Sequence, residues 1–147
     1  MKARQVSGDV DERRFILVLD PKEEAFAAIT EFAKREKILG GSLTALGAFS
    51  RATVGWFDFD TRSYRRIAVD EQCEVLSAVG DIAEGDDGGP SVHIHAVLGL
   101  SDGSTRGGHC LEGIVHPTLE VMLVETPAHL RRRKRPELGI ALIDLST

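Results

Sequence analysis

The chain alternates short apolar runs with polar residues, and one early segment has the spacing of an amphipathic helix. Between residues 21 and 39, apolar side chains recur at intervals of three and four residues, with charged residues between them. These apolar positions are Ala25, Phe26, Ile29, Phe32 and Ala33. The pattern predicts one main helix over residues 21–39 that packs on a core through a single face.

Both ends of this helix carry boundary signals. Asp20 suits the N-cap, Pro21 suits the first helical position, and Glu23 suits the reciprocal partner of a capping box. Gly40 and Gly41 follow the last turn, and glycine is the residue that most often ends a helix. We therefore expect the helix to begin after Asp20 and to stop at Gly40.

The rest of the chain reads as short strands separated by turns. The strand-like runs occupy residues 15–19, 43–49, 52–59, 64–69, 74–79, 92–100, 105–115, 119–125 and 140–143. Many strands beside one helix predict an α+β fold, with the helix packed on a curved antiparallel sheet of about seven to eight strands. We expect a single domain over residues 1–147, with its core over about 13–145.

The overall charge does not favour a surface built to bind nucleic acid phosphates. The formal net charge is −5, and the one cationic cluster is residues 131–135, RRRKR. This cluster lacks the core of an AT-hook and has no interleaved aromatic residue. Direct DNA binding stays open, but a solvated edge or an inter-subunit contact is the more common role of such a run.

Cysteine content and the N-terminus indicate a reducing compartment. Cys73 and Cys110 do not make a disulfide framework in a chain of 147 residues. Residues 1–5 precede no apolar signal core, and no run approaches the roughly 20 apolar residues of a membrane span. We expect a cytoplasmic protein with no membrane partner.

Three histidines give the chain its clearest chemical signal. Within a strand over residues 92–100, His93 and His95 share the face opposite the apolar one. Residues 101–103, Ser-Asp-Gly, fit a three-residue hairpin loop with a left-handed glycine in third place. That loop places His109 directly opposite His95, whereas a two-residue Asp-Gly loop would send His109 to the other face.

Together these histidines predict a divalent-metal site. Imidazole nitrogens bind zinc, iron, nickel or copper, and three histidines with an open position are typical of catalytic zinc, so zinc is the favoured metal. Gly107 and Gly108 would allow a close approach of the backbone beside His109. The alternative is that His93, His95 and His109 are surface or interface residues with ordinary hydrogen bonds.

Glu120 is the one candidate catalytic residue. It interrupts an apolar run at residues 119–123, where a carboxylate needs a partner. It would serve as a fourth metal ligand, as a group that orients a ligand, or as a general base. The alternative is an ion pair with Arg51 or Arg106.

Several stretches in order resemble a known family. They are residues 40–48, GGSLTALGA; residues 73–77, CEVLS; residues 92–96, VHIHA; and residues 107–113, GGHCLEG, running on to 118–121, TLEV. Together they resemble the plants-and-prokaryotes conserved (PPC) domain, in its stand-alone prokaryotic form, which is often labelled DNA-binding with a PD1-like motif. The resemblance implies a homotrimer, an antiparallel sheet with one helix, and a metal site at His93, His95 and His109.

The sequence leaves three functions open. The first is a homotrimeric metal-binding module with a regulatory or assembly role. The second is a metal-dependent enzyme, a hydrolase or lyase, in which a metal-bound water attacks a small molecule and Glu120 moves the proton. The third is a DNA-associated protein that acts through partners, since this chain lacks the AT-hook that precedes the domain in plant members.

Overall fold

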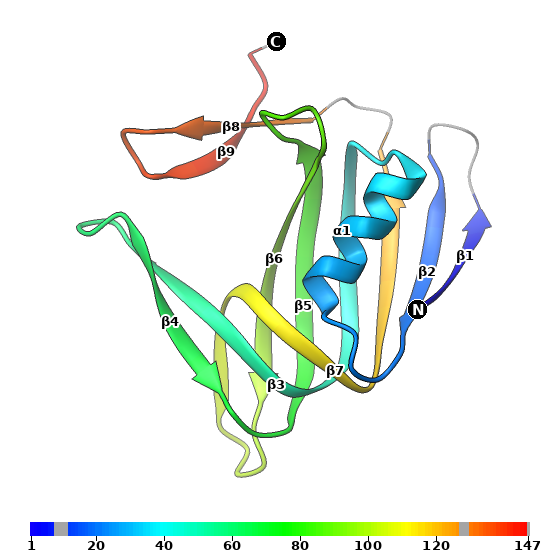
Figure 1. The fold of residues 1–147 in the computed structure, drawn as a ribbon, viewed down its shortest axis with the longest axis vertical. Coiled ribbons are helices and arrows are strands. Elements are labelled where there is room, and N and C mark those ends of the chain that lie inside the picture. Colours follow the sequence, from blue (N-terminus) through cyan, green and yellow to red (C-terminus); the bar gives the residue numbers. More distant parts are fainter. Residues whose placement is uncertain (8–11, 127–129, 147) are drawn as a thin grey trace.

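One helix and nine strands form the regular structure of the described residues, 1–7, 12–126 and 130–146, in a computed structural model (Figure 1). In chain order they are β1 (Lys2–Ser7), β2 (Arg14–Leu19), α1 (Ala25–Glu36), β3 (Gly40–Asp58), β4 (Ser63–Val69), β5 (Cys73–Glu84), β6 (Pro90–Gly99), β7 (Thr105–Glu125), β8 (Arg131–Arg135) and β9 (Ile140–Asp144). The predicted α+β class with one main helix is confirmed.

All nine strands belong to one sheet, in the order β1-β2-β7-β3-β5-β8-β9, with β4 beside β3. The described strand pairs are antiparallel apart from β5 and β8, which meet in parallel at Glu84 and Arg131. β6 pairs with both β5 and β7, and β3 also pairs with both. These four strands therefore close a ring of pairings, which gives the predicted sheet its curvature.

The strand count differs from the prediction for two reasons: some predicted runs merge into one long strand, and two strands were not predicted. Runs 43–49 and 52–59 join in β3, and runs 105–115 and 119–125 join in β7. The register between β3 and β7 shifts at several places, and such bulges bend a strand without ending it. β1 and β8 were not predicted from the sequence, and they raise the total to nine.

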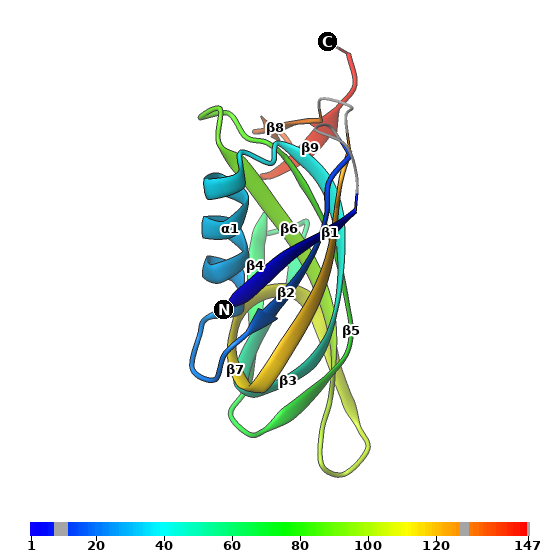
Figure 2. The ribbon, with the colours of Figure 1, turned by 90° about the vertical axis from the view of Figure 1, so that its right-hand side faces the viewer.

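Helix α1 covers one face of the sheet, while the described residues place no helix on the other face (Figure 2). The helix buries Ala25, Ile29, Phe32 and Ala33, which are four of the five positions in the predicted apolar face. Phe32 packs edge to face on Phe15 of β2, with ring centroids 5.2 Å apart. In the described part of the chain, no helix has the length and apolar character needed to cross a bilayer.

The predicted start of the helix is wrong by four residues. Glu24, not Asp20, is the N-cap, and its carboxylate accepts hydrogen bonds from the backbone N–H groups of Phe26 and Ala27. Lys22 cannot be helical, because its φ is 75° and its N–H donates to the Val115 carbonyl at 2.8 Å. Pairing with β7 thus holds Pro21 and its neighbours outside the helix.

The predicted end of the helix is also displaced. Lys37 adopts the left-handed conformation, with φ 58°, and its N–H closes the last turn on the carbonyls of Ala33 and Lys34. Gly40 and Gly41 instead begin β3. A Cβ on Gly41 would lie 2.7 Å from the Val124 carbonyl oxygen, so this glycine is required by the close approach of β7.

Candidate metal centre

The hairpin between β6 and β7 has the turn that the sequence predicts. The Leu100 N–H donates to the Ser104 carbonyl at 2.9 Å, which leaves residues 101–103 as a three-residue loop. Gly103, in third place, has φ 81°. His95 consequently lies directly opposite His109 in the ladder, as predicted.

The three predicted ligands converge on one point. One possible ligand atom from each of His93, His95 and His109 lies within 4.8 Å of the other two. The Nε2 atoms of His93 and His95 are 3.1 Å apart, and the His109 ring centroid is 4.8 Å from that of His93. Three imidazoles this close fit a divalent metal with tripod ligation, which leaves further coordination positions free.

The environment keeps two of these imidazoles in the form that binds metal. Burial, and then the neighbouring His93 and His95, lower the pKa of His109 to about 4. Desolvation, and then His93, also lower the pKa of His95 below its ordinary value. Both rings are therefore neutral at pH 7 and offer a lone pair to a cation.

A carboxylate behind His93 completes the chemistry of the site. The Asp81 Oδ2 atom lies 3.6 Å from His93 Nδ1, on the neighbouring strand β5. Although burial alone would raise its pKa, hydrogen bonds from His93 and Arg132 hold the pKa of the Asp81 carboxyl below its usual value. An ionised carboxylate on the distal ring nitrogen fixes the orientation of a ligating histidine.

Arg132 anchors that carboxylate. It is 6% exposed, forms an ion pair with Asp81, and donates to the Ser91 carbonyl at 2.9 Å. It belongs to the basic run at residues 131–135, which forms β8. Sequence reasoning treated this run as a solvated edge or a contact surface, and it missed the contribution of Arg132 to the histidine site.

Other cations of β8 are also paired. Arg133 contacts Asp86 at 3.2 Å, and Arg135 contacts Asp144 at 3.0 Å. These carboxylates neutralise much of the positive charge that the run shows in the sequence. The run is therefore a weaker candidate for phosphate binding than its composition indicates.

Residues 7–127 match the sequence pattern of the Plants and Prokaryotes Conserved (PCC) domain. This chain belongs to that family. The suspected PPC resemblance is confirmed, PPC and PCC being two abbreviations of one name. Among the described strands, β8 and β9 lie outside the matched residues.

Solved structures with this PPC fold come from bacteria and archaea. A PPC protein from Pyrococcus horikoshii has 29% identity and a TM-score of 0.85, covering 92% of this chain and 93% of its own. A metal-containing protein from Archaeoglobus fulgidus, AF0104, has 28% identity and a TM-score of 0.82, covering 97% and 99%. A protein from Bacteroides thetaiotaomicron, provisionally described as DNA-binding, has 27% identity and a TM-score of 0.86, covering 91% and 93%.

One curated relative is much longer than this PPC chain. The bifunctional protein GlmU from Synechococcus sp. (strain JA-3-3Ab) is 27% identical over 135 residues, which is 90% of this chain. The chain spans 20% of the length of that protein. The likeness therefore concerns one part of a larger protein.

Tyr64 and Gly108 are further parts of the centre. The Tyr64 hydroxyl lies 3.5 Å from His109 Nδ1, and burial raises the pKa of this tyrosine. Nothing in the sequence pattern singled out Tyr64, because it comes from β4. A Cβ on Gly108 would lie 2.5 Å from the Gly55 carbonyl oxygen, so the predicted close approach of the backbone occurs here against β3.

Glu120 lies apart from the histidines of its own chain. It is exposed on β7 between Val18 of β2 and Leu46 of β3, and the described metal-ligand cluster does not include it. Along the sheet, β3 and β5 separate this part of β7 from β6. Of the two arginines named as alternative partners, Arg51 contacts Glu112, at 3.7 Å.

Cys110 faces away from the cluster, as expected from its position next to His109. Its side chain is 5% exposed and lies in the hydrophobic core. Burial raises the pKa of this thiol to about 11, so the thiolate that binds metals is disfavoured.

A pocket of about 470 Å³ opens beside the histidines. It is bounded by the three histidines, by the arm formed by β3 and β4, and by the β8–β9 hairpin. The lining residues that matter for its chemistry are Phe57, Phe59, Tyr64, Arg132, Ile140 and Leu142. Its volume falls in the range of about 300–1,000 Å³ that is typical of small-molecule sites.

Proposed function

We propose that this PPC-domain protein is a divalent-metal-binding module that acts as a homotrimer, with a regulatory and DNA-associated role exerted through partners. The convergence of His93, His95 and His109, with ligand atoms within 4.8 Å of one another, carries the metal part of the proposal. The Asp81 carboxylate behind His93 supports it, because ligating histidines usually have such a partner. Zinc is the favoured ion on ligand chemistry, and AF0104, a similar fold, is named as metal-containing.

The proposed homotrimer is supported by an apolar patch on the sheet face that lacks a helix. Its members are 40% to 62% exposed in the single chain: Leu46, Leu76, Val79, Val97, Met122 and Val124. Exposed apolar patches of this kind are typical of protein interfaces. Association through this face would bury them, and the family resemblance favours three copies.

The metal proposal is tested by the metal content of the purified protein. We expect about one equivalent of zinc per chain by inductively coupled plasma mass spectrometry. This zinc should be lost when His93, His95 and His109 are all replaced by alanine. The matched control is His116→Ala, which removes an exposed histidine of β7 outside the cluster. Equal metal in the wild type and the triple variant would overturn the proposal.

A role through partners fits the charges better than direct binding to DNA. The net charge is −5, and Arg132, Arg133 and Arg135 are paired with aspartates. We expect no retardation of duplex DNA in a gel shift at physiological salt, and clear retardation would show direct binding. The two cysteines are free and buried, which supports a reducing cytoplasm as the compartment.

A metal-dependent enzyme is the second candidate, and the pocket beside the histidines favours it. A bound divalent metal would supply Lewis acidity and an activated water for a hydrolase or lyase. Glu120 would have to come from a neighbouring subunit to move a proton there, because it lies apart from the histidines of its own chain. Turnover of a small molecule that is lost in the triple histidine variant would support this candidate.

A further inference from the structure

The pocket beside the three histidines has an apolar wall on its aromatic side. Phe57, Phe59 and Tyr64 come from the β3–β4 arm and pack edge to face, with the Phe57 ring centroid 5.1 Å from that of Tyr64 and 5.2 Å from that of Phe59. Ile140 and Leu142 of β9 add aliphatic surface. Figure 1 shows the β8–β9 hairpin above the tip of this arm.

The described pocket lining carries a single formal charge, and it is positive. Arg132 is the charged side chain in the described lining, and no aspartate or glutamate contributes to it. Asp81, behind His93, offsets Arg132, and neutral imidazoles add no charge. A divalent cation bound to the histidines would then leave two uncompensated positive charges at this end, and a partly buried site of that kind favours an anion.

The pocket therefore fits a ligand that is apolar at one end and negatively charged at the other. We propose that the pocket binds a small monocarboxylate whose body is aromatic or branched aliphatic, with the carboxylate at the histidine end and the body against Phe57 and Leu142. The inference rests on the proposed metal site and names the class of ligand that this site takes. A volume of about 470 Å³ accommodates a body of one ring.

One wall of the pocket comes from the C-terminal part of the chain. β8 and β9 supply Arg132, Ile140 and Leu142, and they lie outside the residues that match the family pattern. The preference for an apolar carboxylate is therefore inferred from residues of this chain, some of which lie beyond the matched pattern.

The test measures ligand binding to the zinc-loaded full chain by isothermal titration calorimetry. The probes are 3-phenylpropanoate, acetate and 3-phenylpropan-1-ol, which separate the contribution of the ring from that of the carboxylate. We expect 3-phenylpropanoate to bind at least about tenfold more tightly than either of the others, because only it satisfies both ends of the pocket.

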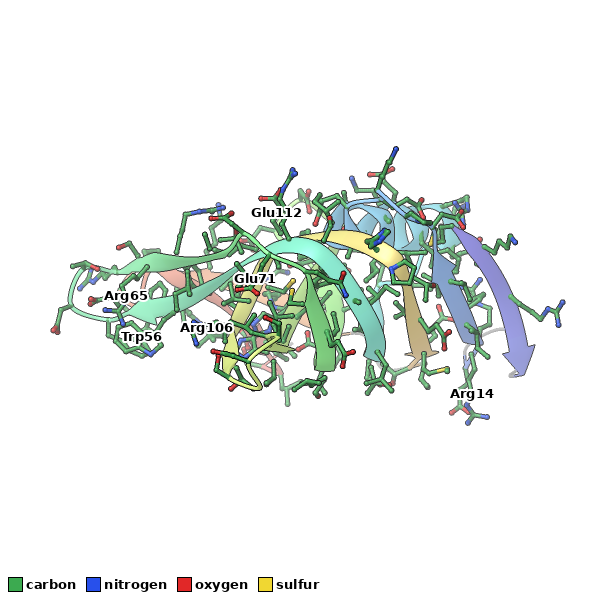
Figure 3. The ribbon with its side chains drawn as sticks, turned by 90° about the horizontal axis from the view of Figure 1, so that it is seen from below. Arg14, Trp56, Arg65, Glu71, Arg106 and Glu112 are labelled. Atoms are coloured by element: carbon green, nitrogen blue, oxygen red, sulfur yellow. The ribbon has the colours of Figure 1, made fainter. Side chains whose placement is uncertain are left out.

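Two neighbouring residues of β3 provide a matched pair of variants. Phe57→Ala removes the central ring of the aromatic wall, and we expect it to weaken the binding of 3-phenylpropanoate about tenfold while leaving that of acetate unchanged. Trp56→Ala is the control, because Trp56 is absent from the lining and stacks with Arg65, its cross-strand neighbour, at 5.0 Å (Figure 3). Zinc content is measured in both variants to confirm that the histidine site is intact.

The outcomes separate this inference from the metal proposal. If zinc binds but the three probes bind equally, or if Phe57→Ala and Trp56→Ala behave alike, the ligand class is wrong and the metal site stands. If the wild type binds no metal, the proposed function fails and this inference falls with it. Preference for 3-phenylpropanoate that depends on Phe57 supports both.

Discussion

Arg132 of β8 is buried and forms an ion pair with the half-buried Asp81 of β5. Through it, the β8–β9 hairpin is connected to the metal site, since Asp81 also lies 3.6 Å from His93 Nδ1. The two residues are 51 positions apart in the sequence. Arg132 therefore holds the carboxylate that orients one of the predicted metal ligands.

Replacing Arg132 should weaken metal binding. We expect Arg132→Met to lower zinc affinity about 10–100-fold, because Asp81 loses its anchor and His93 its fixed orientation. Competition with a chromophoric chelator measures this change. Arg132→Lys keeps the charge but not the paired contacts, so its zinc affinity should lie between that of the wild type and that of Arg132→Met.

The control for this prediction lies on the same strand. Arg133→Met removes the ion pair with Asp86, in which the two side chains are 34% and 44% exposed. Zinc affinity should stay within about twofold of the wild-type value. Circular dichroism checks that all three variants are folded. Equal losses of affinity in the Arg132 and Arg133 variants would contradict the connection.

The turn before β7 should matter to the metal as well as to the fold. Gly103→Ala forces a side chain onto φ 81°, at a cost of about 1 kcal/mol, and any adjustment of the turn disturbs the pairing of His95 with His109. We expect lower stability in urea and weaker zinc binding. Gly88→Ala, at φ 78° in open space, should lose similar stability and keep its zinc affinity. Unchanged zinc affinity in Gly103→Ala would argue against the role of the turn.

Acid should destabilise the metal-free protein through His109. Its pKa is about 4 in the folded chain and about 6.5 when exposed, so the unfolded chain binds the proton more tightly between these values. The contribution of neutral His109 to the free energy of unfolding is therefore fully present above pH 6.5 and is lost as the pH falls towards 4. For a half-buried ring we expect about 1–2 kcal/mol, after allowance for solvent screening.

Urea unfolding of the metal-free protein at several pH values tests this effect. His109→Gln has no imidazole to protonate, so its stability should change less than that of the wild type over the same interval. Parallel pH dependence in the two proteins would assign the effect to another group.

The apolar patch predicts the assembly state. We expect the wild type to be a trimer by light scattering after size exclusion, and Leu46→Glu, at a position 62% exposed, to shift it to monomers. Leu145→Glu changes a side chain that is 81% exposed and outside the patch, and it should remain trimeric. A monomeric wild type at micromolar concentration would end the homotrimer proposal.

The sequence predicts the centre well where the information is local. His93, His95 and His109 belong to one hairpin, so strand alternation and the chemistry of residues 101–103 were enough to bring them together. The same reasoning did not place Tyr64, which reaches the site from β4 through pairing with β3. Long-range pairing of this kind has no signature in the local pattern.

Errors at the helix ends and in the basic run have the same origin. Asp20 and Glu23 do interact, since the Glu23 carboxylate accepts a hydrogen bond from the Asp20 N–H at 2.7 Å. However, backbone hydrogen bonds with β7 hold this segment in a loop that precedes the helix. In the basic run, alternation along a strand points Arg132 inward, and only the presence of Asp81 on β5 makes that burial favourable. Tertiary partners decided both cases.

The confinement of the three ligands to residues 93–109 also bears on how the protein folds. A β-hairpin closes in about 1–10 μs, whereas the contact of His109 with Gly55 joins distant parts of the chain and must wait for a larger loop to close. The ligands can therefore meet before the ring of β3, β5, β6 and β7 is complete. Zinc present during refolding should stabilise this early hairpin and speed the formation of the sheet, and stopped-flow refolding with and without a chelator would measure the difference.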